Sequence, residues 1–399
     1  MTAGPGAPAA RPGLAARVGV HPAVVATAST HLVVDAYTNI YAPLLPLLIP
    51  RLGLSLTMAG TLAMCFQLAS SFSQLGWGTL ADRWRPRALL VGGPILAVVA
   101  LSLIGTAPTA GTLAAVLFVG GLGGAAFHPP AAALVHGVSG PRKAFSMSVH
   151  ISGGSLGFSL APIVFAPAIT ALGLHWSWLV ALPGLAALSF TLRRLPAIAP
   201  AHAEARQSWS ALWPYRRPLA LLYAIVVLRT FTAYSFATFM PVLLTTQGMS
   251  VAAASAAVSL YLFASGVGGF LGGHLADVHG PRRVILLSLV TSVPFLAAAP
   301  LAGGWTMAVL LSIGGFLLQS TLPVNVTFGQ QLAPVSAATV SSLMMGFAWG
   351  TGALLVPAVG MIADRSSLAT ALLVVALAPA LAIGAAVGLP RGAGAEAES

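Results

Sequence analysis

Charged residues are scarce in this sequence. Of its 399 residues only 6% are Asp, Glu, Lys or Arg, whereas 57% are hydrophobic. A water-soluble domain carries about 25% charged residues. The chain therefore has too little charge to solvate the surface of a soluble globule of this size, and we expect an integral membrane protein.

Cysteine is nearly absent as well. Cys65 is the single cysteine and lies inside an apolar run, which excludes a disulfide framework and a Cys-x-x-Cys metal site. The sequence has no His/Asp/Glu cluster at metal-ligand spacing and no Gly-x-Ser-x-Gly signature. We therefore expect no metal, no organic cofactor and no enzymatic activity. Residues 1–20 lack a compact apolar stretch before a cleavage site, so the first membrane helix is expected to act as the insertion signal.

Long apolar runs fill most of the chain. A bilayer core requires about 20 mostly apolar residues per helix. Twelve runs meet this requirement: 23–49, 56–81, 87–106, 110–137, 143–171, 176–192, 217–245, 250–276, 283–301, 305–331, 336–363 and 367–389. The tenth and eleventh are divided only by a weak break around Pro334.

One long polar stretch divides the twelve runs into two groups of six. It predicts an N-terminal tail over 1–22, a six-helix bundle over 23–192, a linker over 193–216, a second six-helix bundle over 217–390 and a tail over 391–399. The fold class expected is all-α, with 12 transmembrane helices in two bundles.

The basic residues predict the orientation. Lys and Arg collect in cytoplasmic loops of membrane proteins. With the N-terminus inside, 15 of the 18 basic residues fall on the cytoplasmic side, and only Arg51 and Arg365 lie in outer loops. Both termini and the linker are therefore expected in the cytoplasm, and the protein in the cell inner membrane. The net charge of +11 is spread over short loops rather than one patch, so no nucleic-acid partner is expected.

A short motif occurs twice, 195 residues apart. Gly78-Thr-Leu-Ala-Asp82 follows the second span and Gly273-His-Leu-Ala-Asp277 follows the eighth, each before a basic cluster. The two glycines allow close helix approach, and the aspartates can bind the arginines or a helix N-terminus. Contacts of this kind can form in one conformation and break in another, although charges that only fix topology are the alternative. The predicted gating residues are Gly78, Asp82, Arg83, Arg87, Gly273, Asp277, Arg282 and Arg283.

With this repeat, the polar linker and the two sets of six spans, the sequence resembles the major facilitator superfamily, and within it the fosmidomycin-resistance efflux proteins. The segments that carry the second resemblance are His31–Asp35, Pro43–Leu48, Phe66–Ser71, Phe127–Pro129 and Gly360–Asp364. The resemblance implies that spans 1, 4, 7 and 10 line a central cavity, in which Asp35, His128, Arg229 and Gln319 face one another.

Asp35 is the principal candidate for proton coupling. It lies in the middle of span 1 with no Lys or Arg near it in sequence, and ionisable groups within a membrane are costly and usually functional. Burial favours the neutral form of a carboxylate, so Asp35 can bind and release a proton. His31 lies four residues earlier on the same helix face and can share that proton. A purely structural aspartate is the alternative.

His128 and Arg229 are the other ionisable candidates deep within spans. Pro129 and Pro130 should bend or break the helix that carries His128, which we expect to assist the proton step. Arg229 can hold an anionic substrate or pair with Asp35, in which case Asp35 would stay charged. Alternatively, Arg229 lies near a span end and reaches toward the interface.

Several polar residues are candidates for substrate contact. We predict this role for Arg229, Tyr37, Gln67, His150, Tyr234 and Gln319. His150 lies in span 5 beside a ladder of small residues, Gly153, Gly157 and Ala161, which allows close packing. The ladder resembles a degraded form of the superfamily's antiporter motif, with Ala161 where the family has Gly.

The sequence therefore predicts a monomeric secondary transporter that exports a small organic solute, such as a phosphonate-type antibiotic, in exchange for protons. Two rocking halves would give alternating access. The nearest alternative is a symporter or uniporter that takes up an organic anion or nutrient. An intramembrane enzyme or receptor is the remote alternative. The expected partners are the substrate, protons and the lipid bilayer.

Overall fold

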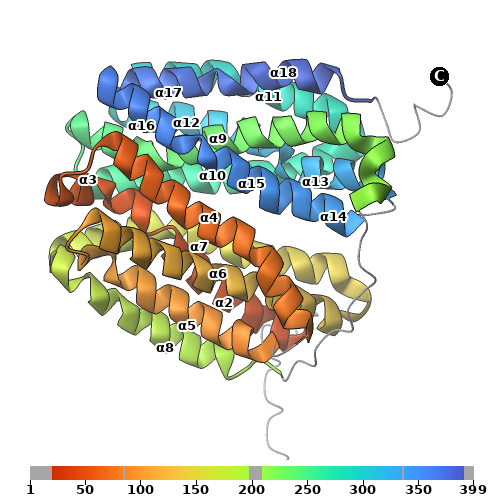
Figure 1. Ribbon diagram of the computed structural model, residues 1–399, viewed down its shortest axis with the longest axis horizontal. Coiled ribbons are helices and arrows are strands. Elements are labelled where there is room, and N and C mark those ends of the chain that lie inside the picture. Colours follow the sequence, from red (N-terminus) through yellow and green to blue (C-terminus); the bar gives the residue numbers. More distant parts are fainter. Residues whose placement is uncertain (1–19, 84–85, 197–208, 335–336, 391–399) are drawn as a thin grey trace, which may run out of the picture.

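The computed structural model describes residues 20–83, 86–196, 209–334 and 337–390. Regular structure in these ranges is helical throughout. The helices run roughly side by side in two layers, one built from the first half of the chain and one from the second (Figure 1).

The first layer contains seven α-helices that form six membrane spans. Their bounds are α2 Pro22–Thr38, α3 Tyr41–Leu52, α4 Leu56–Arg83, α5 Pro86–Ser102, α6 Ala110–Val138, α7 Lys143–Leu172 and α8 Ala181–Leu192. α2 and α3 together make the first span, with a break at Asn39. A short 3-10 helix, Leu174–Val180, begins the sixth span.

The second layer repeats this plan with more interruptions. Its α-helices are α9 Arg216–Thr246, α10 Val251–His279, α11 Pro281–Ala298, α12 Gly304–Gln319, α13 Thr321–Leu332, α14 Ala337–Ser341, α15 Ala348–Leu354, α16 Val356–Arg365, α17 Leu368–Ala376 and α18 Ala378–Val387. A π-helical turn, Ser342–Phe347, joins α14 to α15 within the eleventh span.

The twelve predicted spans each coincide with a helical segment. Eleven segments of the described chain are long and apolar enough to cross a membrane, and α4, with 28 residues, occupies the predicted second span. The weak break between spans 10 and 11 is real, since α13 ends at Leu332 before Pro334. α6 continues without a break through Pro129 and Pro130. Neighbouring helices can satisfy the carbonyls that prolines leave free in a membrane helix.

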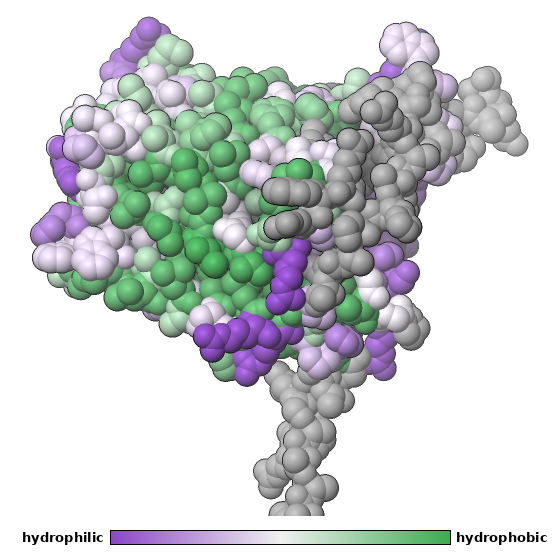
Figure 2. Space-filling view, turned by 60° about the horizontal axis from the view of Figure 1, so that its bottom comes forward, coloured by the Kyte–Doolittle hydropathy of each residue, from purple (hydrophilic) through white to green (hydrophobic). Residues whose placement is uncertain are grey.

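The surface agrees with a lipid environment. Figure 2 shows hydrophobic residues across the middle of one face and hydrophilic residues gathered toward its margins. Large apolar side chains are exposed on outward faces, including Phe190 on α8, Phe270 on α10 (74% exposed) and Leu381 on α18. Such a surface is suited to lipid and unsuited to water.

Glycine permits the closest helix contacts within each half. A Cβ atom at Gly153 or Gly157 of α7 would overlap the carbonyl oxygens of Ala28 or Leu32 on α2. In the second half, a Cβ at Gly272 of α10 would overlap the carbonyl oxygen of Ser320, at the junction of α12 and α13. Small residues draw membrane helices together because the backbones can then approach. The ladder predicted in span 5 is thus a packing surface for α2.

The two halves of the protein meet along two main seams. α7 packs on α10, and α4 packs on α15 and α16, while α3 also contacts α9.

One end of the molecule, called here the basic end, carries Arg87, Arg142, Lys143, Arg193, Arg194, Arg216, Arg217, Arg282 and Arg283. The opposite end carries Arg51 and Arg365. α14 and the last turns of α18 lie toward the basic end, and α3 lies toward the opposite end (Figure 1).

Replacement of Gly272 by Ala tests the packing of α10. The added methyl group would displace α10 from Ser320, and overpacking of this kind costs about 1–3 kcal/mol. We expect a lower midpoint of thermal unfolding in detergent. The matched control is Gly273→Ala, because a Cβ there would lie 3.7 Å from Pro323 Cγ, an ordinary contact. Equal midpoints for the two variants would contradict the packing assignment.

Candidate functional site

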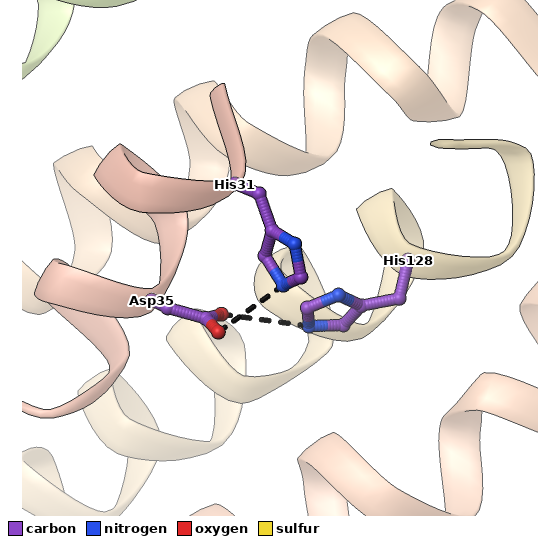
Figure 3. A group of neighbouring side chains, drawn as sticks. All are labelled: His31, Asp35 and His128. Carbon is purple, nitrogen blue, oxygen red and sulfur yellow. Dashed lines mark ion pairs between the residues drawn. The ribbon is translucent and has the colours of Figure 1, made fainter. Parts of the chain in front are cut away.

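The carboxylate of Asp35 lies against two histidines. His31 Nε2 lies 3.1 Å from Asp35 Oδ2, one helical turn away on α2. His128 Nε2, from α6, lies 3.8 Å from Asp35 Oδ1. Both imidazoles point toward the carboxylate (Figure 3). The structure thus brings together the three residues predicted for proton coupling.

The other nitrogen of His31 determines where protons can be. His31 Nδ1 lies 2.9 Å from the backbone carbonyl oxygen of His150 on α7. A carbonyl oxygen only accepts hydrogen bonds, so Nδ1 must carry a hydrogen and donate it. In neutral His31, Nε2 would then present a lone pair to the carboxylate. The 3.1 Å contact is favourable only with a cation between these two atoms, and a proton is the simplest.

The same atoms satisfy the distances of a small cation site. The ligand atoms of His31, Asp35 and His128 all lie within 4.8 Å of one another. Two imidazoles and a carboxylate are ligands that zinc and similar divalent ions accept. No metal was expected from the sequence, whereas these three residues could hold one.

Helix α7 completes the surroundings of the acid. The ring of His150 packs on that of His31, with 4.4 Å between the ring centroids. A Cβ at Gly154 would lie 2.6 Å from Asp35 Oδ2, so a side chain there would have to displace the carboxylate. Phe127 covers the His31 ring at 5.7 Å. His150, predicted to contact substrate, is therefore placed beside the acid, and Gly154 and Phe127 were not anticipated.

Arg229 lies in the second half and is almost fully buried, with 2% of its surface exposed. Its guanidinium donates hydrogen bonds to Gln319 Oε1 on α12 and, at 3.2 Å, to Thr230 Oγ1. Its Nε is buried without a hydrogen-bond partner. Among the described residues no carboxylate forms an ion pair with Arg229, so neither the pairing with Asp35 nor the interfacial position considered from sequence is found.

Tyr234 and Gln67 connect the two halves near Arg229. Tyr234, on α9, lies within electrostatic reach of the guanidinium and beside the side chain of Gln67 on α4. The predicted substrate residues Arg229, Gln319, Tyr234 and Gln67 thus form one connected group. Tyr37 does not join it: its hydroxyl donates to the Val180 carbonyl and its ring packs 4.7 Å from that of Phe165.

The repeated motif makes contacts within each half. Arg87 donates to the Leu195 carbonyl at 3.4 Å, just beyond α8, and Arg282 donates to the Val387 carbonyl at 2.7 Å, the last residue of α18. Each arginine thus meets the carboxyl end of the last helix of its own half, where a cation is favourable.

Other residues of the predicted gate are less engaged. Asp277 and Arg283 are exposed, and the side chains of Asp82 and Arg83 lie outside the described part. A Cβ at Gly78 would lie 3.9 Å from the nearest atom, on Pro129. In the second copy of the motif, the close approach to the neighbouring backbone, at Ser320, is made by Gly272, one residue before the motif glycine Gly273.

Curated relatives of similar length include several transporters. The chain is 29% identical to the Uncharacterized MFS-type transporter YfnC of Bacillus subtilis, covering 91% of this chain and 92% of that protein. It is 28% identical to the Fosmidomycin resistance protein of Escherichia coli, covering 88% and 89%. It is 25% identical to the Probable sulfoacetate transporter SauU of Cupriavidus necator, covering 80% and 82%.

Solved structures share the fold. A bacterial homolog of the human lysosomal transporter Spinster, inward-facing and occupied, matches with a TM-score of 0.80 at 16% identity, covering 94% of this chain and 97% of that chain. FucP in its outward conformation matches with a TM-score of 0.61 at 17% identity, covering 92% and 98%. The sequence also matches the Major Facilitator Superfamily profile over residues 27–254 and 219–396. The chain therefore belongs to the Major Facilitator Superfamily, whose members are not enzymes but move small molecules across the bilayer.

Proposed function

We propose that this chain is a proton-coupled exporter of small organic anions, such as phosphonate-type antibiotics, and that it works as a monomer in the cell inner membrane. Protons entering through the His31–Asp35 pair would drive the substrate out by antiport. The basic end would face the cytoplasm, because loops rich in Lys and Arg remain on that side.

The observation that carries the proposal is the contact between His31 and Asp35. Since His31 Nδ1 is committed to the His150 carbonyl, the 3.1 Å contact between Nε2 and Asp35 Oδ2 requires a proton or another cation. The Asp35 side chain is 19% exposed and that of His128 is 26% exposed. A proton can therefore be exchanged with the space beside these two residues, and His128 is placed to relay it.

Arg229 supports an anionic substrate. A buried guanidinium without a carboxylate partner is costly, and an anion that binds it would remove that cost. Its Nε is an unused donor, and planar guanidinium groups bind phosphonate or carboxylate oxygens in pairs. Gln319 and Tyr234 supply further polar atoms around the same guanidinium, and Gln67 lies beside Tyr234.

The relatives agree with an anionic substrate, and they leave two directions of transport open. Fosmidomycin resistance in one relative favours export, and a probable sulfoacetate transporter among the others favours exchange or uptake of an organic anion.

Uptake by proton symport is the second candidate, because the two halves hold one acid that can bind a proton and one buried cation that can bind an anion. In a symporter, protonation of Asp35 and binding of an anion at Arg229 would occur together. Antiport requires the opposite coupling, in which proton and substrate exclude each other.

Transport in proteoliposomes with pH gradients of either sign separates these candidates. With fosmidomycin as the probe anion, antiport predicts uptake into vesicles that are acidic inside, whereas symport predicts uptake into vesicles that are acidic outside. Fosmidomycin movement that ignores both gradients would refute proton coupling, while retained exchange of the probe would still support a carrier.

Asp35→Asn removes the group that holds the proton. We expect the accumulation of fosmidomycin driven by a pH gradient to be lost, while exchange of the probe between equal concentrations continues, because the amide does not titrate. Glu204→Gln, in the predicted linker, is the control acid. Full gradient-driven transport by Asp35→Asn would contradict the assignment.

Arg229→Gln removes the buried charge but keeps hydrogen-bonding atoms. A hydrogen bond to a charged group contributes about 1.5–3 kcal/mol, so we expect at least a tenfold rise in KM for the anionic probe. Arg229→Lys, which keeps the charge, should lose less. Exposed Arg194 supplies the control Arg194→Gln. An unchanged KM in Arg229→Gln would exclude substrate binding at this site.

Gly154→Ala tests the geometry of the proton site without changing any titratable group. The added methyl group would push His31 and Asp35 apart, so we expect the pH dependence of transport to shift while the fold is retained. Gly76→Ala is the control, because no atom lies within 4 Å of a Cβ placed there. Equal pH profiles for Gly154→Ala and the parent would show that the close contact is unimportant.

A further inference from the structure

Asp364 joins the two halves at the end of the molecule opposite the basic end. It lies on the last turn of α16, and its carboxylate accepts hydrogen bonds from the first turn of α4 in the other half. Asp364 Oδ1 accepts from the Leu56 N–H at 2.9 Å. Asp364 Oδ2 accepts from the Thr57 N–H at 2.9 Å and from the Thr57 hydroxyl at 2.6 Å.

These bonds complete the capping of α4. The first N–H groups of a helix lack partners within that helix and carry partial positive charge. In α4 the Met58 N–H donates to Ser55 Oγ at 3.0 Å. The two preceding N–H groups, of Leu56 and Thr57, donate to Asp364. The acid that stabilises the start of α4 thus belongs to the opposite half of the protein.

The helices beside this contact are packed as closely as their backbones allow. A Cβ at Gly360 of α16 would lie 2.5 Å from the Thr57 nitrogen, and a Cβ at Gly60 of α4 would lie 2.9 Å from the Val356 carbonyl oxygen. Glycine on both helices therefore permits the approach that brings Asp364 to Thr57.

The segment that carries Asp364 is a third form of the repeated motif. Gly360-Met-Ile-Ala-Asp364 has the pattern Gly-x-(Leu/Ile)-Ala-Asp of the segments ending at Asp82 and Asp277. At the basic end, Arg87 and Arg282 bind carbonyls within their own halves, and Asp277 is exposed. The contact of Asp364 instead crosses from one half to the other.

We propose that Asp364, together with Leu56 and Thr57, forms a latch that holds the two halves closed at the end opposite the basic end, and that this latch must open in each transport cycle. Asp364 is exposed, Leu56 and Thr57 are half-buried, and the hydrogen bonds between them lie at the surface. Water can replace each lost hydrogen bond there, so the latch is weak enough to break repeatedly. It biases the equilibrium between two arrangements of the halves, whichever substrate or ion drives the change.

Pulsed electron paramagnetic resonance measures the opening directly. Spin labels at Gly111→Cys, in the first turn of α6, and Thr246→Cys, at the end of α9, report the separation of the halves at the latched end. Both positions are exposed, and Cys65→Ser removes the native thiol. The labelled full-length protein is compared in lipid nanodiscs without substrate or gradient.

Asp364→Ala should increase the ratio of the long-distance to the short-distance population at least about tenfold, because charge-assisted hydrogen bonds are lost only in the closed state. Asp364→Asn and Thr57→Val each remove part of the contact and should give smaller increases. If Asp364→Ala does not fold, these two variants still test the proposal.

Arg365→Ala is the matched control, since it removes the neighbouring exposed charge on the same turn of α16. Its distance distribution should equal that of the parent. The proposal is overturned if the Asp364 and Thr57 variants keep the parent distribution, or if Arg365→Ala shifts it equally. Because no proton gradient or substrate is present, either result is independent of the proposed export activity.

Discussion

The hydrogen bond from His31 to the His150 carbonyl governs the chemistry of the proposed proton site. It commits Nδ1 as a donor, so Nε2 alone is available to Asp35. The bond exists because α7 docks on α2 through Gly153 and Gly157, whose lack of side chains lets the two backbones touch. The packing of two helices thereby determines which nitrogen of His31 faces the carboxylate of Asp35.

Much of the fold was predictable from the sequence, because each membrane span must by itself be apolar enough to lie in lipid. The twelve apolar runs and the position of the polar linker follow from that requirement alone. The pairing of His31 with Asp35 was also predictable, since residues four apart share a helix face. The approach of His128 followed from the resemblance, which placed the first and fourth spans around one space.

Other features depend on how helices rotate against one another, and composition does not encode that rotation. His150 was predicted to contact substrate, and α7 places its ring against that of His31, a neighbour that its sequence position did not indicate. Tyr37 carries the same prediction, and its hydroxyl donates to the Val180 carbonyl within the first half. Close packing was expected at Gly273 and occurs at Gly272, a difference of one residue that turns the contact by about 100° around the helix axis. That Arg229 binds Gln319 and not Asp35 could not be predicted from the sequence, because it depends on how the two halves are placed relative to each other.

Helix α7 has a second connection that bears on how the halves communicate. Besides holding His31 and Asp35, it packs on α10 of the other half, where the Ile163 N–H donates to Ser259 Oγ at 3.2 Å. The same helix therefore touches the acid on one side and the opposite half on the other. In the proposed transporter, a rotation of the halves at that contact would move the helix that touches His31 and Asp35, and so would link the proton site to the arrangement of the halves.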